Sequence, residues 1–404
     1  MTIRQQPQRR DEDMRLAATA AALSRAEALG PALIARARDT ELTRHVPEVT
    51  MDELRADDLF RILQPRRYGG AECDIVALLD VAAALARADA SVAWTWASLA
   101  SHTWMLGLFG AEAQALVWGR DHQALIASSL AFPAGHAVKV AGGFELSGDW
   151  RFATGAGLCP WILLGAIVIS DDDADAFEYR VFLVRTADVQ RADNWDAMGL
   201  RGTGSGDVCV QKLRVPNVMS LSAASMAGGP EVTGGPLYRL PVFALYPFVL
   251  AGVALGNAEA CLAEFTAIAR HRAANYNRAK LADFQSIQIR IAGAAAKVDA
   301  ARRIMRGTLI EAMDDARAQH TPDLMRRACY RRDGAFAVNL CTEAVATLFK
   351  ANGASGLAGA NVMQRQFRDA QAIDAHIAFS FDAAGTMYGR AALGLPIDNP
   401  LLQP

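Results

Sequence analysis

The sequence lacks several patterns that would fix its class at once. Its six cysteines include no C-x-x-C pair and no histidine at a spacing typical of zinc sites, so we expect no metal centre and interpret them as small buried side chains. No apolar run reaches the roughly 20 residues of a membrane-spanning helix, since prolines and glycines interrupt the longest, residues 241–255. No G-x-G-x-x-G follows a strand and opens a helix, which argues against direct NAD(P)H binding by this chain.

An excess of one charge is missing too. The chain has 404 residues, of which 41 are basic and 43 acidic, and its formal net charge is −2. Without a basic stripe, neither a nucleic acid nor an anionic membrane surface is an expected partner. Residues 1–15 are polar and lead into an amphipathic helix rather than an apolar segment, so we expect no signal peptide and a cytoplasmic protein.

What the chain has in abundance is hydrophobic side chains, 52% of the total, which are enough to bury a large core. Leu, Ile and Ala recur at three- and four-residue spacing up to about residue 109, which predicts helices. Alternating β-branched and aromatic residues then predict roughly six to eight strands, and long helical segments follow from near Pro247. The pattern predicts a helical domain over residues 1–124, a β domain over 125–222 and a helical bundle domain over 223–404.

Three motifs carry a resemblance to a known fold. Residues 195–205 read WDAMGLRGTGS and precede a strand, residues 148–155 read GDWRFATG, and residues 284–288 read FQSIQ at the start of a bundle helix. With the domain order, they resemble the acyl-CoA dehydrogenase fold over nearly the whole chain. The resemblance implies an α+β protein with an N-terminal α-helical domain, a central β-barrel-like domain and a C-terminal four-helix bundle.

The segment of residues 364–382, QRQFRDAQAIDAHIAFSFD, indicates which branch of that fold the chain resembles. The dehydrogenases carry a catalytic glutamate in the bundle, whereas here no glutamate follows residue 364 and His376 lies in the segment instead. Abstraction of the weakly acidic α-proton of an acyl-CoA needs a carboxylate. Oxygen transfer needs hydrogen-bond donors and a moderately basic group, which histidine supplies.

The chain is therefore similar to the oxygenase components of two-component flavin-dependent monooxygenases, such as p-hydroxyphenylacetate hydroxylase and dibenzothiophene monooxygenase. This resemblance implies that a separate NAD(P)H:flavin reductase supplies reduced FMN, with FAD as the alternative flavin. Dioxygen would add at the flavin C4a to give a hydroperoxide, and one oxygen atom would pass to a small organic substrate. A homotetramer built through the bundle is implied as well.

The resemblance assigns catalytic roles to three residues, His102, Ser128 and His376. Each histidine resembles a group held against the substrate or the flavin peroxide, and a satisfied core histidine is the alternative interpretation. Either Ser128 or Ser129 resembles the serine that stabilises the peroxide, with Ser128 as the nominal choice. Strand-end serines bonded to their own backbone are the alternative.

The positions that resemble flavin contacts are Ser129, Trp150, Thr154, Arg201, Thr203, Ser205, Arg272 and Arg368. The Trp150 indole and the Thr154 hydroxyl would meet the isoalloxazine edge. The loop of residues 201–205 has the glycine spacing that lets backbone approach a ligand closely. Arg272 resembles the arginine of the flavin phosphate, with a solvated helix face as the alternative. Arg368 would hold the bundle or contact the flavin of a neighbouring subunit.

Two other functions stay open at this point. One is an FAD-dependent acyl-CoA dehydrogenase or a nitroalkane-oxidase-like enzyme, whose acid would be Glu259 or Glu264 on a different bundle helix. The other is a flavin-free relative that acts as a binding protein. An aromatic substrate is expected because aromatic side chains are candidates to line the pocket. These are Trp94, Trp96, Trp104, Phe132, Phe243 and Phe379.

Overall fold

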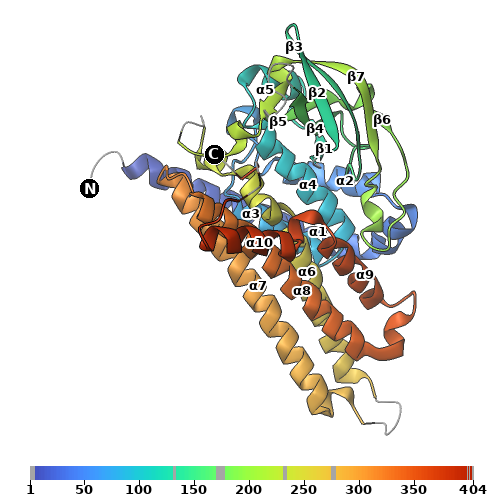
Figure 1. Ribbon diagram of the computed structural model, residues 1–404. Coiled ribbons are helices and arrows are strands. Elements are labelled where there is room, and N and C mark those ends of the chain that lie inside the picture. The colour runs from blue at the N-terminus through green and yellow to red at the C-terminus, as the bar shows by residue number, and fades with distance from the viewer. Residues whose placement is uncertain are drawn as a thin grey trace.

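A helical part, a β part and a second helical part follow one another along the chain (Figure 1). The computed structural model describes residues 5–130, 133–169, 178–230, 234–273, 279–397, 399 and 401–402. The order of the three parts is the one that the hydrophobic pattern predicts.

The first part centres on one helix that is buried on every side. Its α-helices are α1 (Gln5–Thr43), α2 (Glu48–Ala56), α3 (Val76–Ala86), α4 (Ala90–Leu106) and α5 (Ala111–Trp118). Every residue of α4 is buried, which is the pattern of a helix inside a core rather than on a surface. The Asp89 side chain caps α4 by accepting hydrogen bonds from the amides of Ser91 and Val92. Helix α4 therefore presents all of its side chains to neighbouring elements.

The β part is one sheet whose strand β1 packs against α4. The strands are β1 (Ile126–Ser129), β2 (Gly135–Val140), β3 (Gly143–Trp150), β4 (Trp161–Ile169), β5 (Glu178–Arg185), β6 (Gln190–Arg191), β7 (Val208–Pro216) and β8 (Ser220–Ser222). Their order is β6-β7-β3-β2-β4-β5-β8, and β1 pairs in parallel with β4. Strand β1 is buried along its whole length and lies against α4. This contact places the residues of β1 beside His102, in the C-terminal half of α4.

The second helical part is a bundle built around α8. Its helices are α6 (Val242–His271), α7 (Gln285–Arg317), α8 (Leu324–Asn352), α9 (Val362–Asp374) and α10 (Phe381–Ala392). Helix α8 contacts the other four, and Figure 1 shows α6, α7 and α8 running side by side below the β part. Gly252 and Gly256 let α6 approach α3 closely, since a side chain at either would meet the backbone oxygen of Leu79 or Ala83.

Helix α6 is more extended than the sequence predicts. It begins at Val242 rather than near Pro247, and that proline lies inside the helix. By length and composition alone this helix, among those described, is apolar enough to cross a membrane. However, 89% of the apolar window is buried inside the protein, as in the core helix of a folded domain.

A clamp of two consecutive residues joins the bundle to the loop that follows β6. The carboxylate of Asp369 on α9 accepts a hydrogen bond of 2.7 Å from the amide of Leu200. Beside it, Arg368 donates to the backbone oxygen of Met198 and pairs with Glu41 on α1. Burial raises the pKa of Asp369 to about 7, because water no longer solvates its charge. Arg368 and Asp369 therefore fix the loop of residues 195–205 against the bundle.

The raised pKa of Asp369 predicts how stability depends on pH. When the pKa of a carboxyl rises on folding, the protonated group stabilises the fold. This contribution is complete at a pH below 3.8, the pKa in the unfolded chain, and it is lost as the pH rises through about 7. An Asp369→Asn variant keeps the acceptor for Leu200 but has no proton to lose. We expect the free energy of unfolding of the wild type, minus that of the variant, to fall between about pH 4 and about pH 7 in urea titrations. A difference that stays constant over this range would contradict the assignment.

Candidate functional site

All three parts of the chain contribute to one cavity of about 810 Å³. Helix α4 and strand β1 form one side, with the turn after β3 and the loop of residues 195–205. The bundle closes the other side through α6, α8, the end of α9 and the segment that follows it. The described lining is mainly apolar with a few convergent polar groups, which is the usual character of a small-molecule site.

His102 and Ser128 form a hydrogen-bonded pair in the cavity wall. The Nδ1 atom of His102 lies 2.7 Å from the backbone oxygen of Ile126, and its Nε2 atom lies 2.7 Å from the Ser128 hydroxyl. A carbonyl oxygen only accepts, so Nδ1 carries the proton and Nε2 accepts the hydrogen bond that Ser128 donates. Burial lowers the pKa of His102 to about 4, which keeps the ring neutral. The Ser128 oxygen therefore keeps its lone pairs for a ligand.

A chain of three hydroxyls lines the same cavity. Thr203 donates to the backbone oxygen of Leu200 and lies 2.7 Å from Ser205, which lies 2.8 Å from Thr154. Because each hydroxyl has one proton, Ser205 donates to Thr203 and Thr154 donates to Ser205. All three line the cavity. Thr154 at the head of the chain therefore offers acceptor lone pairs to an N–H group of a bound molecule.

Ser129 and two aromatic residues complete the β side of the cavity. The Ser129 hydroxyl donates to the backbone oxygen of Arg151, so Ser128 and Ser129 have different partners although both line the cavity. Phe152 and Trp195 pack edge to face with ring centroids 5.9 Å apart. Phe152 has a φ of 61°, an unfavourable backbone angle for a bulky residue, and 62% of its side chain is exposed. This strained turn places its ring at the cavity edge.

His376 lies on the bundle side, between the end of α9 and a short helix of residues Ile377–Phe379. Its Nδ1 atom accepts a hydrogen bond from the amide of Ala378, so a neutral ring carries its proton on Nε2. The ring contacts Trp94 edge to face and stacks on Tyr246. Burial, aided by the positive charge of Arg331, lowers the pKa of His376 to about 4. The two histidines of the cavity are thus neutral and have opposite tautomers.

Two of the predicted flavin contacts lie elsewhere. Trp150 is fully buried, and its indole N–H donates to the backbone oxygen of Gly165 within the sheet. The expectation that this indole meets the flavin ring is therefore corrected: it is a core residue of the β part. Arg201 does not line the cavity, and its guanidinium bonds to Asp196 and to the backbone of Ala197. Its contact with flavin stays a prediction.

The two predicted arginines of the bundle also lie away from the cavity within one chain. Arg368 belongs to the clamp described above. Arg272 follows the end of α6 and donates to the side chain and backbone oxygen of Asn352. The cavity residue Leu250 lies on the same helix, roughly 33 Å away at the rise of an α-helix. Any contact of Arg272 with a flavin would therefore involve the flavin of another copy.

Among the aromatic candidates, the structure separates lining residues from core residues. Trp94 and Phe243 line the cavity. Trp96, Trp104 and Phe379 are buried and do not line it, while Phe132 is outside the described residues. The pattern of the sequence does not single out three further lining residues, Tyr246, Arg331 and Asn399, because they come from segments far apart in the chain.

No described lining residue of the cavity is an aspartate or a glutamate. Glu259, one candidate for a dehydrogenase acid, is paired with Arg87 and Arg302 instead. Glu264 does not line the cavity either. The described site therefore lacks a carboxylate to abstract an α-proton.

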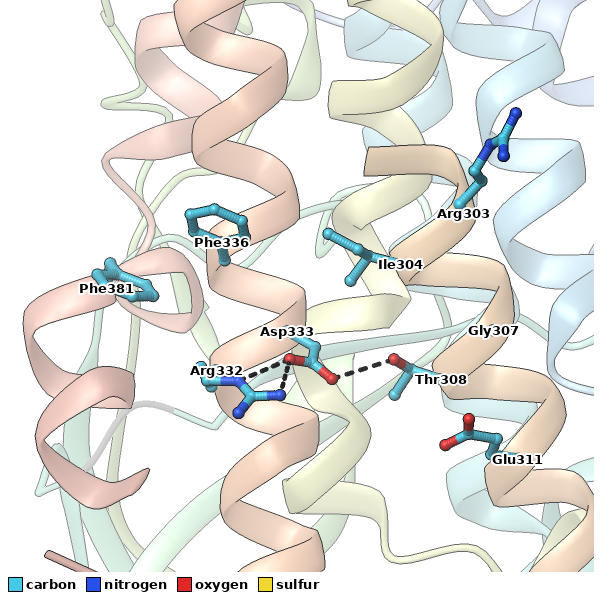
Figure 2. Close-up of a pocket in the computed structure, with 9 residues that line it drawn as sticks. All are labelled: Arg303, Ile304, Gly307, Thr308, Glu311, Arg332, Asp333, Phe336 and Phe381. Carbon is cyan, nitrogen blue, oxygen red and sulfur yellow. Dashed lines mark hydrogen bonds and ion pairs between the residues drawn. The ribbon is translucent and has the colours of Figure 1, made fainter. Parts of the chain in front are cut away.

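A second hollow lies on the outside of the bundle between α7, α8 and α10 (Figure 2). Two of its charged groups are paired with each other, since Arg332 forms an ion pair with Asp333, which also accepts a hydrogen bond from Thr308. In the part of the chain that the structure describes, no three His, Cys, Asp or Glu side chains are grouped to hold a metal ion. The chemistry of the chain is therefore assigned to the inner cavity.

Comparison with known proteins identifies the family. Residues 11–120 match the acyl-CoA dehydrogenase N-terminal domain family, and residues 248–381 match the acyl-CoA dehydrogenase C-terminal domain family. The flavin-dependent monooxygenase oxygenase subunit HsaA of Rhodococcus jostii is 32% identical over 388 residues, which are 94% of this chain and 100% of that protein. The chain belongs to the oxygenase subunits of flavin-dependent monooxygenases.

Other relatives of this oxygenase support the assignment. The oxygenase component of the FADH2-dependent resorcinol hydroxylase of a Rhizobium species is 35% identical, over 89% of this chain and 90% of that protein. The crystal structure of 3-HSA hydroxylase from a Rhodococcus species has a TM-score of 0.88 at 32% identity, covering 94% of this chain and 98% of that one. XiaF from a Streptomyces species, in complex with FADH2 and glycerol, has a TM-score of 0.90 at 25% identity, covering 96% and 99%.

These comparisons confirm the predicted fold class, the monooxygenase activity and the use of reduced flavin. As the oxygenase component of a two-component system, the enzyme depends on a separate flavin reductase. The cavity fits such a cofactor, because the Thr154 acceptor and the hydroxyls beside it suit the N–H groups of a reduced isoalloxazine, and the rings of Phe152 and Trp195 offer packing surface.

The hydrogen bonds of the two histidines predict their ring states. We expect long-range proton–nitrogen NMR spectra to show His102 with its proton on Nδ1 and His376 with its proton on Nε2, and both rings to stay neutral until the pH approaches about 4. His102→Asn and His376→Asn variants assign the signals. Protonation of either ring near the ordinary value of 6.5 would show that it is not held as described.

Proposed function

We propose that this oxygenase hydroxylates a small aromatic substrate with reduced flavin that a separate NAD(P)H:flavin reductase supplies. The observation that carries the proposal is an apolar cavity that brings together two neutral histidines and several hydroxyl groups, and whose described lining has no carboxylate. Three relatives support an aromatic substrate, since they are a resorcinol hydroxylase, a p-hydroxyphenylacetate 3-hydroxylase and an indole-3-acetate monooxygenase.

The flavin would lie on the β side of the cavity. Reduced flavin, when bound, supplies the electrons that activate dioxygen for transfer of one oxygen atom to the substrate. Thr154, Ser205 and Thr203 would hold the ring edge through their ordered hydroxyl chain. The flavin would be FMN, as the sequence resemblance implies, or FAD, since one relative is an FADH2-dependent hydroxylase and XiaF forms a complex with FADH2.

Ser128 and His102 would act as one unit in the part of the site where dioxygen reacts. The Ser128 hydroxyl donates to His102 Nε2, and its oxygen is an acceptor for a proton-bearing group of a bound molecule. His102 is fixed by the Ile126 carbonyl, so its ring cannot turn to accept from another donor without breaking this bond. The neutral imidazole accepts the hydrogen bond of the serine hydroxyl and thereby orients the serine oxygen.

His376 would act on the substrate. Its Nε2–H is a donor, and the ring is held between Trp94 and Tyr246 on the bundle side. A hydrogen-bond donor at this place can hold a phenolic oxygen and orient the aromatic ring. The aromatic walls formed by Trp94, Tyr246 and Phe243 would hold a flat ring and exclude water from it.

The position of Arg272 bears on assembly. Since it lies roughly 33 Å along α6 from the cavity of its own chain, it would reach a flavin phosphate only in an oligomer. We therefore propose a homotetramer built through the bundle, in which Arg272 and Arg368 lie near the flavin of another copy. The cytoplasmic location stays a prediction of the sequence.

Replacing His376 tests its role in substrate chemistry. In a His376→Ala variant we expect product formation to fall about a hundredfold, because the donor that positions the substrate oxygen is lost. Binding of reduced flavin, measured anaerobically by titration, should change little. His136→Ala is the matched control, since His136 is an exposed histidine of β2 outside the cavity. Equal product yield from the His376 and His136 variants would rule out the role.

Supplying reduced flavin without the reductase tests the function as a whole. We expect the purified protein, mixed with chemically reduced FMN or FAD and oxygen, to hydroxylate at least one member of a panel of phenols and indoles. Mass spectrometry with isotopically labelled dioxygen should find one labelled oxygen atom in the product. Reduction of a bound flavin by an acyl-CoA, with no hydroxylated product, would support the dehydrogenase alternative instead.

A further inference from the structure

Arg331 is a cation on the bundle side of the cavity that the proposed mechanism does not use. It lies on α8 and lines the cavity with Phe243 and Tyr246 of α6. Its Nε atom is buried without a hydrogen-bond partner, and no described carboxylate forms an ion pair with it. A guanidinium remains charged in proteins, and an unpaired buried charge is costly. Such a group needs an anionic partner that the described residues do not supply.

The guanidinium of Arg331 is held in place by a backbone oxygen of α6 that lacks its helical hydrogen bond. Pro247 has no backbone N–H, so the oxygen of Phe243, four residues earlier, lacks its usual helical partner. The Nη1 atom of Arg331 donates to this oxygen at 3.2 Å. One donor of the guanidinium thus orients the group, while Nη2 has no hydrogen-bond partner among the described residues.

The groups around Arg331 are donors as well. The Tyr246 hydroxyl lines the same part of the cavity and has no hydrogen-bond partner in the described ranges, and burial raises its pKa so that it keeps its proton. The His376 ring stacks on Tyr246 and bears its proton on Nε2. Asn399 also lines this end, but its side-chain oxygen already accepts from the amide of Leu401. Donors of Arg331, Tyr246 and His376 therefore gather in this cavity, whose described lining has no carboxylate.

We infer that this end of the cavity is an anion subsite, and that the substrate is an aromatic acid whose carboxylate pairs with Arg331 while its ring lies between His376 and the flavin side. The inference rests on the proposed function, because it names the substrate class for the same cavity. The carboxylate accepts from Arg331 Nη2 and from the Tyr246 hydroxyl. The negative charge of the carboxylate neutralises the positive charge of the guanidinium, for which the described residues supply no ion-pair partner.

The test compares binding of acids with that of uncharged analogues of the same shape. Quenching of tryptophan fluorescence reports binding, since Trp94 and Trp195 line the cavity. The probes are p-hydroxyphenylacetate and its longer homologue p-hydroxyphenylpropionate, each paired with its primary amide. We expect the wild-type protein at neutral pH to bind at least one acid about tenfold or more tightly than its amide, in keeping with a hydrogen bond to a charged group.

Variants at position 331 assign this preference to the guanidinium. Arg331→Gln should abolish it while keeping a donor for Phe243, and Arg331→Lys should retain part of it. Arg332→Gln is the matched control, since the neighbouring arginine lies in the outer groove beside Asp333 (Figure 2) and should leave the preference unchanged. Thermal unfolding of each variant, measured alongside, ensures that only folded proteins are compared.

Several outcomes would overturn the inference. Equal affinity of acids and amides, failure of every probe to bind, or a preference that survives in Arg331→Gln each excludes an anion subsite at Arg331. Loss of reduced-flavin binding in Arg331→Gln, measured by anaerobic titration, would instead assign the arginine to the flavin phosphate. Hydroxylation of a neutral amide by the wild type, without any preference for the acid, would retain the oxygenase function and reject only the acid subsite.

Discussion

Both ring nitrogens of His102 are engaged between α4 and β1, and the chemistry of the cavity depends on this bridge. The carbonyl of Ile126 fixes the proton on Nδ1, which in turn makes Nε2 the acceptor for Ser128. Helix α4 is buried on every side, so the ring has little freedom to leave this position. A serine oxygen with free lone pairs therefore faces the cavity in a defined direction.

The rest of the site is built from donors and acceptors that the protein orders in advance. On the β side, the hydroxyl chain ends in an acceptor at Thr154. On the bundle side, His376, Tyr246 and Arg331 present donors. The described lining has no carboxylate, so the cavity favours neutral and anionic ligands over cations. A reduced flavin and an acidic aromatic substrate are ligands of that kind.

Local sequence patterns predicted the fold and part of the site for identifiable reasons. The hydrophobic periodicity changes where the strands begin. Seven of the candidate site residues line one cavity, while their individual roles stay predictions: His102, Ser128, Ser129, Thr154, Thr203, Ser205 and His376. Trp150 was misplaced because neighbouring strand residues face opposite sides, and a motif does not show which side is the core. Arg331 was missed because its role depends on Pro247, a residue of another helix.

The sequence by itself determined the order of helical and β parts, the lack of a glutamate after residue 364 and the family resemblance, since these are local or compositional properties. Only the tertiary structure decided which groups meet. The tautomers of His102 and His376, the direction of the hydroxyl chain and the unpaired charge of Arg331 all arise from contacts between segments far apart in the chain. A hydrogen bond forms or fails with a difference of a few tenths of an ångström in the donor–acceptor distance, and no spacing in the sequence encodes such a difference.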